Sequence, residues 1–260
     1  MSDKILLYMW KSHRQTLIST HGFYVEQAKL RLVSQFENIE AEADQAAADW
    51  LKRNNDQFDP ERDELGDFYE GASDASIEVY SLLSDMRDQT ILNVVAWMFH
   101  EWDKQLRDWL AREIRRWHSG AAVAEKVWSA DFAQIVELLE SFGWPISRDK
   151  SFSYLDACRL VVNVYKHGKG KSLEELKQKY PEYLQDPFSG VGGPLFGIAQ
   201  CDHTHLRVSK EQLQVFSDTI IGFWRAVPEH TFYSQCKDVP GWFEKALLKD
   251  RSSQQQRTIK

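Results

Sequence analysis

The chain has 260 residues, of which 43% are hydrophobic and 27% charged, and its formal net charge is −7. This composition is typical of a folded globular protein and excludes a wholly disordered chain. The negative balance argues against a broad surface for duplex DNA, because such a surface needs an excess of lysine and arginine. Ten tryptophans and an aromatic content of 13% predict a large apolar core.

Cysteine usage and hydropathy indicate the compartment. Cys158, Cys201 and Cys236 are few and widely spaced, which is typical of a reduced compartment rather than a disulfide-linked secreted domain. The apolar stretch 5–10 is too short for a signal peptide, and charged residues directly follow the apolar run 90–99. We therefore expect a cytoplasmic protein with no membrane partner.

The first half of the chain predicts long helices joined by a loop. Apolar residues at 36, 39, 43, 46 and 50 alternate in steps of three and four, which predicts a bundle helix over 21–54. A short extra helix is expected within 1–20. Glycine, proline and acidic residues over 55–74 predict a long connection. An uninterrupted apolar pattern over 74–117 then predicts one long helix or two collinear ones.

Capping patterns mark the helices of the second half. A helix begins at Ser129 or Asp131, and Ser209 with Gln212 caps another that runs through Ala226. Ser172 with Glu175 predicts the cap of a short helix over 173–179. The glycine- and proline-rich region near 180–208 is expected to be an irregular insertion, and the polar end, 249–260, a flexible tail. These patterns predict an all-α bundle of five to six helices in one domain, 1–248, with an irregular C-terminal segment.

The stretch from Ser151 to Ser172 predicts a helix with a marked start and stop. Ser153 and Asp156 form a capping pattern, and Gly168 is expected to end the helix in a left-handed conformation. The residues expected to face a core recur at helical spacing: Leu155, Cys158, Val161, Val162 and Tyr165.

The opposite face of this helix carries candidate chemistry. Arg159, Asn163 and His167 follow one another in steps of four, so they line one polar face. A cation can hold a phosphate, an amide can orient it, and an imidazole can transfer protons near neutral pH. His100 and Glu101, on the long helix before it, could point toward this face. The alternative interpretation is the solvated face of an ordinary amphipathic helix.

Three lysines follow the polar row and are the expected phosphate-binding residues: Lys166, Lys169 and Lys171. The triplet 170–172, Gly-Lys-Ser, does not form a P-loop, because Tyr165 stands where the first glycine of that motif belongs and a helix precedes it instead of a strand.

A second cluster has side chains able to bind a metal ion. Cys201, His203 and His205 alternate, so on an extended chain they could converge, with His230 and Cys236 as further ligands. No second paired-ligand motif at zinc spacing accompanies them. A polar loop without metal is the expectation, and a metal site is the alternative. No cofactor is expected.

The segment from Asn163 to Gly168, NVYKHG, resembles the signature region of HEPN-type proteins. The resemblance covers roughly residues 75–175 and rests on Asn163 and His167, which match the asparagine and histidine of the family motif. The motif's arginine should stand beside the asparagine, and here Val162 occupies that position. The resemblance implies an all-helical, commonly dimeric domain, and many such proteins are metal-independent ribonucleases of toxin or phage-defence systems.

The resemblance also implies roles for individual residues. His167 would act as general base or acid on a ribose 2′-hydroxyl and the leaving oxygen, with two copies of His167 meeting in a dimer cleft. Arg159 or Lys166 would hold the phosphate in place of the missing arginine. The first hypothesis is therefore an RNA-cleaving or RNA-binding effector. The second is a non-catalytic helical protein that binds a partner chain, in which Asn163 and His167 have structural roles. The sequence leaves open whether the protein is an enzyme.

Overall fold

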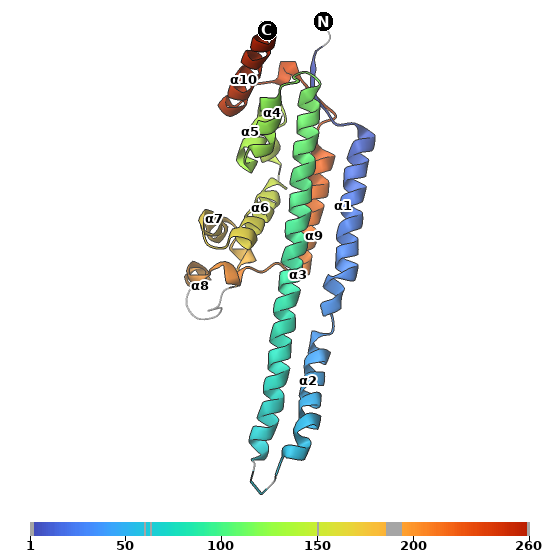
Figure 1. Cartoon of the computed structure of the whole chain (residues 1–260), viewed down its shortest axis with the longest axis vertical. Coiled ribbons are helices and arrows are strands. Elements are labelled where there is room, and N and C mark those ends of the chain that lie inside the picture. The colour runs from blue at the N-terminus through green and yellow to red at the C-terminus, as the bar shows by residue number, and fades with distance from the viewer. Residues whose placement is uncertain (1–2, 60, 63, 150, 186–193, 259–260) are drawn as a thin grey trace.

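A computed structural model of the chain describes residues 3–59, 61–62, 64–149, 151–185 and 194–258. Its central element is α3 (Leu65–Arg115), whose 51 residues span roughly 75 Å at a helical rise of about 1.5 Å per residue. Figure 1 shows α3 running along most of the length of an elongated molecule. Helices make up 78% of the structure, which confirms the predicted all-α class. The helices are more numerous than the predicted five to six, and run from α1 to α10.

The C-terminal half of α3 carries the core. Its inward side chains, from Ile91 to Ile114, are buried at helical spacing and include Trp102 and Trp109. Large aromatic side chains bury the most apolar area per residue, so this half is the stable centre of the fold. The helices that cover it are α1 (Lys11–Arg31), α4 (Ala121–Ser129), α6 (Phe152–His167) and α9 (Lys210–Ala226).

A two-stranded antiparallel sheet joins the N-terminus to the segment after α9. Strand β1 (Ile5–Tyr8) pairs with β2 (His230–Phe232), and the Leu7 amide donates to the buried Thr231 Oγ1 at 3.2 Å. Within 1–20, the predicted helix is present over 11–20 as the start of a longer helix, whereas 5–8 form a strand because their pairing partner lies far away in the sequence. α1 then begins at Lys11, ten residues before the predicted start.

The described residues of the segment 37–90, here called the arm, form a helical hairpin that projects from the core in Figure 1. It consists of α2 (Ile39–Asn54) packed along the N-terminal half of α3. The predicted continuous helix over 21–54 is wrong in its middle, since a 3-10 turn at Val33–Phe36 separates α1 from α2. Val33 is buried at this turn, so the chain bends where α1 leaves the core.

The connection predicted over 55–74 is shorter in the structure, because α3 already begins at Leu65. Packing against α2 explains the difference. A Cβ on Gly71 would lie 2.5 Å from the Trp50 ring, so this glycine permits close approach of the two helices. Phe68 packs on the same indole with ring centroids 5.3 Å apart. Tertiary contact therefore overrides the weak helix propensity of the glycines.

The shorter helices complete the body: α5 (Phe132–Ser141), α7 (Lys171–Lys179), α8 (Pro194–Gln200) and α10 (Gly241–Thr258). Capping boxes at Asp131 and Ser209 confirm the predicted starts of α5 and α9. The predicted Ser172 cap is wrong, because α7 begins at Lys171 after Gly170. Helix α4 had no counterpart among the predicted elements.

The insertion expected near 180–208 is described in part, since 186–193 lie outside the described residues. Its remaining parts are the turn Pro181–Tyr183, helix α8, the turn His203–His205 and a β-bridge between Leu184 and Leu206.

Residues 249–258, expected to be a flexible tail, continue α10, and Asp250 gives the reason. Its buried carboxylate accepts hydrogen bonds from the amides of Ala122 and Val123, at 2.8 and 3.0 Å, and pairs with His118 at 3.0 Å. Asp250 thus caps the N-terminus of α4 from a distant helix. Burial acts to raise the pKa of Asp250, but the hydrogen bonds outweigh it and the pKa is lowered.

Among the described residues, no helix combines the length and apolarity needed to cross a membrane.

Asp250→Ala should destabilise the protein, because it leaves two amides at the start of α4 without partners. We expect the free energy of unfolding to fall by about 1–3 kcal/mol, the cost of unsatisfied buried groups. Urea denaturation followed by circular dichroism measures the change. The matched control is Glu244→Ala, at an exposed position of the same helix, which should change stability by less than about 0.5 kcal/mol. Equal effects of both substitutions would contradict the capping role.

The buried His21 should make stability depend on pH. Burial lowers the pKa of His21, although a hydrogen bond with the backbone of Ser217 and the charge of Asp218 act in the opposite direction. The unfolded chain therefore binds a proton at higher pH than the folded chain, so stability is lost as the pH falls below about 6.5. Thermal unfolding at several pH values should show this loss, and His21→Gln should reduce its slope. Asp218→Asn, which removes a charge that raises the pKa of His21, should steepen it.

Candidate functional site

Helix α6 is positioned by a buried apolar face against α3 and α9. Leu155, Cys158, Val161 and Val162 are buried and Tyr165 packs at the edge of the core, which confirms the predicted inward face. Val162, at the position of the arginine in the HEPN motif, is 1% exposed. A cation at 162 would therefore enter the core instead of joining the polar row on the opposite side of the helix.

The sequence predicted where α6 ends but not how it begins. Gly168 ends the helix where predicted, and its φ of +68° favours glycine, although its ψ of −123° is not that of the left-handed helical cap that was expected. The predicted cap by Ser153 and Asp156 is wrong, because the helix begins at Phe152 with Ser151 at the N-cap position. Asp149 accepts hydrogen bonds from the amide and hydroxyl of Ser151 instead, at 2.8 and 2.6 Å. These bonds lower the pKa of Asp149.

Carboxylates from α6 and α7 hold the guanidinium of Arg159. It donates two hydrogen bonds to Asp156 Oδ1, at 3.0 and 2.7 Å, and lies 3.5 Å from Glu175. Lys179 lies 3.8 Å from Asp156, and the Tyr180 hydroxyl donates to it at 3.2 Å. Burial and the charge of Asp156 raise the pKa of Tyr180 to about 12. This network joins α6 to α7 and neutralises Arg159.

The rest of the polar row is free of such partners. Asn163 is half-buried and His167 is exposed, and neither side chain makes a hydrogen bond with any residue that the structure describes. Lys166 and Lys169 are exposed beside them. Lys171 points into solvent with its side chain 92% exposed, 3.9 Å from Glu175. The accessible cations therefore lie at the C-terminal end of α6, one turn or more beyond Arg159.

Two further histidines come close to this end of α6. His100, on α3, lies near enough to Lys166 for its charge to act on the imidazole: burial and then Lys166 lower the pKa of His100. Glu101 instead pairs with Lys104 at 2.8 Å on its own helix. His203, from the turn before α9, places its ring 3.5 Å from where a Cβ on Gly168 would be. Gly168 directly follows His167.

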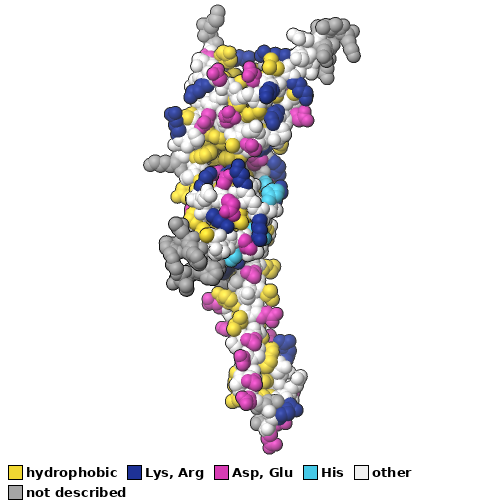
Figure 2. All heavy atoms as spheres, turned by 90° about the vertical axis from the view of Figure 1, so that its left-hand side faces the viewer, with side chains coloured by type: hydrophobic (Ala, Val, Ile, Leu, Met, Phe, Trp, Pro, Cys, Tyr) yellow, Lys and Arg dark blue, Asp and Glu magenta, His cyan; other side chains and the backbone are white. Residues whose placement is uncertain are grey.

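We call the exposed group His100, Lys166, His167, Lys169 and His203 the histidine–lysine cluster. Its members come from α3, from the end of α6 and from the turn His203–His205. Figure 2 shows histidine side chains next to lysine and arginine side chains on the face of the molecule that carries α6 and α7. Imidazoles next to ammonium groups can exchange protons with a bound anion and hold its charge.

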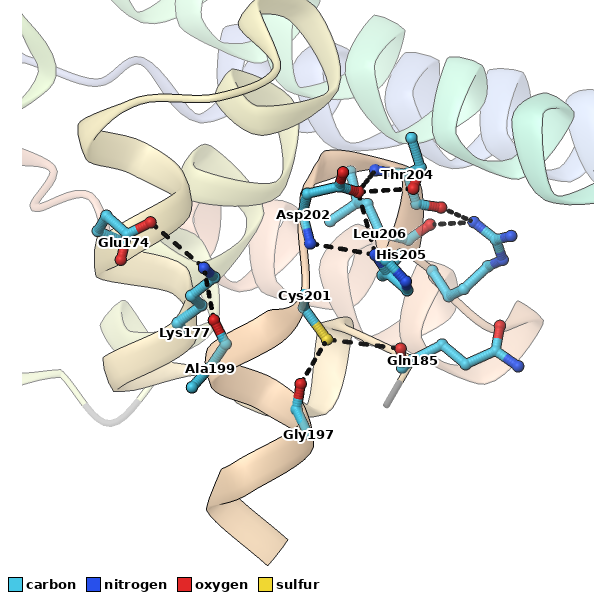
Figure 3. A network of polar contacts seen from close by, with 11 residues as sticks. Glu174, Lys177, Gln185, Gly197, Ala199, Cys201, Asp202, Thr204, His205 and Leu206 are labelled. Carbon is cyan, nitrogen blue, oxygen red and sulfur yellow. Dashed lines mark hydrogen bonds and ion pairs between the residues drawn. The ribbon is translucent and has the colours of Figure 1, made fainter. Parts of the chain in front are cut away.

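The expected metal ligands do not converge. Residues 203–205 form a 3-10 turn instead of an extended chain, so the alternation of side chains is lost. In Figure 3, Cys201 points toward the carbonyl groups of Gly197 and Gln185, at 3.5 and 3.6 Å, while His205 points toward Asp202. His203 lies apart, against Gly168. Within the described part of the chain, no three such side chains gather as a metal site would require.

The additional metal-ligand candidates are placed elsewhere. His230 stacks on Tyr8 with ring centroids 4.7 Å apart, in the small sheet. Cys236 follows the turn after β2, where burial and then Asp238 raise the pKa of its thiol. The sequence suggested that His100 could point toward the polar face of α6, but it offered His203 only as a metal ligand. The position of His203 depends on how the turn at 203–205 packs against α6, which no sequence spacing indicates.

Comparison with known proteins provides no relative for this chain. No protein-family model matches it, and no curated protein or solved structure does so either.

The pair Asp156–Arg159 should stabilise the protein, since both side chains are largely buried at the junction of α6 and α7. A double-mutant cycle with Asp156→Asn and Arg159→Met, followed by urea denaturation, should give a coupling energy of about 1 kcal/mol or more. The matched control is Lys177 with Glu174, whose carboxylate is 63% exposed, and its coupling should stay below about 0.5 kcal/mol. A coupling energy near zero for the first pair would leave Arg159 available for a ligand.

Proposed function

We propose that the histidine–lysine cluster binds RNA and cleaves it without a metal ion, with His167 as the general acid or base. The observation that carries the proposal is the position of His167: exposed at the end of α6, beside two lysines and next to the turn that carries His203. Phosphate binding needs accessible cations, and Lys166 and Lys169 supply them. The role of Arg159 in this proposal is to position α6 on α7, because its charge is already compensated.

The reaction that suits these groups is an internal transesterification. A neutral imidazole takes the proton of a ribose 2′-hydroxyl, and the 2′-oxygen forms a bond to phosphorus. The bond from phosphorus to the 5′-oxygen breaks, and a protonated imidazole gives its proton to that oxygen. The products are a 2′,3′-cyclic phosphate and a 5′-hydroxyl. The lysines stabilise the negative charge that develops on the phosphoryl oxygens.

Two proton carriers are needed, and His167 supplies one of them. His203 is the candidate for the second proton carrier within the same chain. Its ring lies against Gly168, whose Cα is about 3.8 Å from that of His167. A second copy of His167 across a dimer cleft is the arrangement that the HEPN resemblance implies. The same resemblance is the basis for proposing a homodimer and a role in a toxin or phage-defence system.

The second candidate function is a helical protein that binds a partner chain without catalysis. The observation in its favour is the pairing of Arg159 with Asp156 and Glu175, which makes one third of the polar row a structural contact. The buried Val162 points in the same direction, since it excludes the motif's arginine from this face.

RNA cleavage in the presence of EDTA distinguishes the two candidates. We expect His167→Ala to lower the cleavage rate by about 10²-fold or more, as for other general acid–base groups. His203→Ala should lower it as well if this residue is the second proton carrier. Arg159→Met should change the rate much less than His167→Ala does. The matched control is His13→Ala, a histidine that pairs with Arg112 instead of joining the cluster.

Two outcomes would reject catalysis. One is the absence of cleavage by the wild type on single-stranded, hairpin and transfer RNA. The other is equal cleavage by the wild type and His167→Ala, which would indicate a contaminating ribonuclease. In either case the second candidate function, binding of a partner chain, would remain.

A further inference from the structure

The arm exposes apolar side chains along α3. Tyr69, Ile77 and Tyr80 are 58%, 63% and 46% exposed. Spacings of eight and three residues place all three within about 80° of one another on a helix with about 100° per residue. Leu65 is also exposed and lies about 40° from Tyr69 around the helix, whereas the exposed Leu82 and Met86 lie on its other side. Several exposed apolar side chains on one face of a helix are typical of an interaction site.

An acidic stripe borders the apolar one. Glu70, Asp74 and Glu78 repeat in steps of four. Around the helix they lie next to the apolar face, on the side of Ile77. Together with Asp67 they are exposed and make no ion pair with any described residue. Figure 2 shows hydrophobic and acidic side chains side by side along the arm. An apolar strip edged by uncompensated carboxylates thus runs along the projecting part of α3.

Charge is divided unequally between the arm and the rest of the chain. Residues 37–90 contain sixteen acidic and four basic residues, so the arm is more negative than the whole chain, whose net charge is −7. The remainder of the chain is therefore net positive. Near the junction with the core, Arg207 lies 2.9 Å from Asp88, which leaves the uncompensated charge toward the middle and tip of the arm.

This charge decides which partner fits the surface. Nucleic acids and anionic lipid surfaces are repelled by an acidic strip. Two copies of the arm would place like charges opposite each other, which opposes their pairing. A helix with an apolar face and flanking lysines or arginines satisfies both the apolar strip and the carboxylates. Helix-in-groove recognition of this type uses apolar anchors at helical spacing.

We infer that the arm is a docking surface for a basic amphipathic helix of another protein, seated on Tyr69, Ile77 and Tyr80 and paired with Glu70, Asp74 and Glu78. This inference rests on the second candidate function, partner binding, and is independent of RNA cleavage. Electrostatic attraction speeds the encounter, and the aromatic and aliphatic side chains hold the bound helix.

The probe is a fluorescein-labelled peptide of about 18 residues, or about five helical turns, with leucines on one face and lysines on the other. Fluorescence anisotropy with the full chain should show binding that weakens at high salt. A peptide of the same composition in scrambled order, and one with glutamates in place of the lysines, should each bind at least about tenfold more weakly.

Paired variants locate the binding surface. Ile77→Ser with Tyr80→Ser, and separately Glu70→Lys with Asp74→Lys, should each weaken binding by about tenfold or more. The matched controls use exposed residues of the body: Phe23→Ser with Leu248→Ser, and Glu125→Lys with Glu137→Lys. These should change the dissociation constant by less than about twofold. All substituted positions are exposed, so the fold should persist, and circular dichroism checks this.

Three outcomes would overturn the inference. If none of the peptides binds, the arm does not recognise basic amphipathic helices. If arm and control variants bind equally well, the peptide docks elsewhere, and partner binding as a function survives without this surface. If light scattering shows a dimer that Ile77→Ser with Tyr80→Ser dissociates, the occupant of the arm is a second copy of the chain.

Discussion

The other elements of the protein depend on the burial of one half of α3. From Ile91 to Ile114 this helix meets α1, α4, α6 and α9, and Trp102 and Trp109 are buried between them. The other half extends past the core, with α2 packed along one side. A single helix roughly 75 Å long thus has an end that is buried and an end that is largely accessible. The exposed apolar side chains of the arm follow from this division, because one neighbouring helix cannot cover every face of α3.

The rotation of α6 about its own axis decides which of its polar residues can act. Leu155, Cys158 and Val162 fix that rotation by facing the core. As a result Arg159 points toward α7, where Asp156 and Glu175 hold it, and His167 emerges at the free end. The polar row that appears uniform in sequence is therefore divided in space. Its first member stabilises the α6–α7 junction and its last is accessible to a ligand.

Local signals predicted several parts of the fold that local interactions determine, although the caps expected at Ser153 and Ser172 are wrong. The capping boxes at Asp131 and Ser209 and the glycine stop at Gly168 were all identified, because each depends on residues within one helical turn. Elements that depend on distant partners were missed. β1 forms because Thr231 and its neighbours pair with it, and α10 extends to Thr258 while Asp250 caps α4. The same reason explains why His203, which approaches α6 from a separate turn, was weighed only as a metal ligand.

The two candidate surfaces lie on the same helix but are electrostatically separate. His100 and Ile77 are 23 positions apart on α3, which places them roughly 35 Å apart along its axis. This separation is several times the Debye length of about 8 Å at physiological ionic strength. The acidic arm therefore does not repel an RNA phosphate at the histidine–lysine cluster to any large extent, and the lysines there do not weaken attraction of a basic helix to the arm. A net charge of −7 for the whole chain conceals this arrangement, since it combines a strongly acidic arm with a body that is net positive. Nucleic-acid binding by one end and protein binding by the other are thus physically compatible in one chain, and each can be removed by substitution without changing the charge environment of the other.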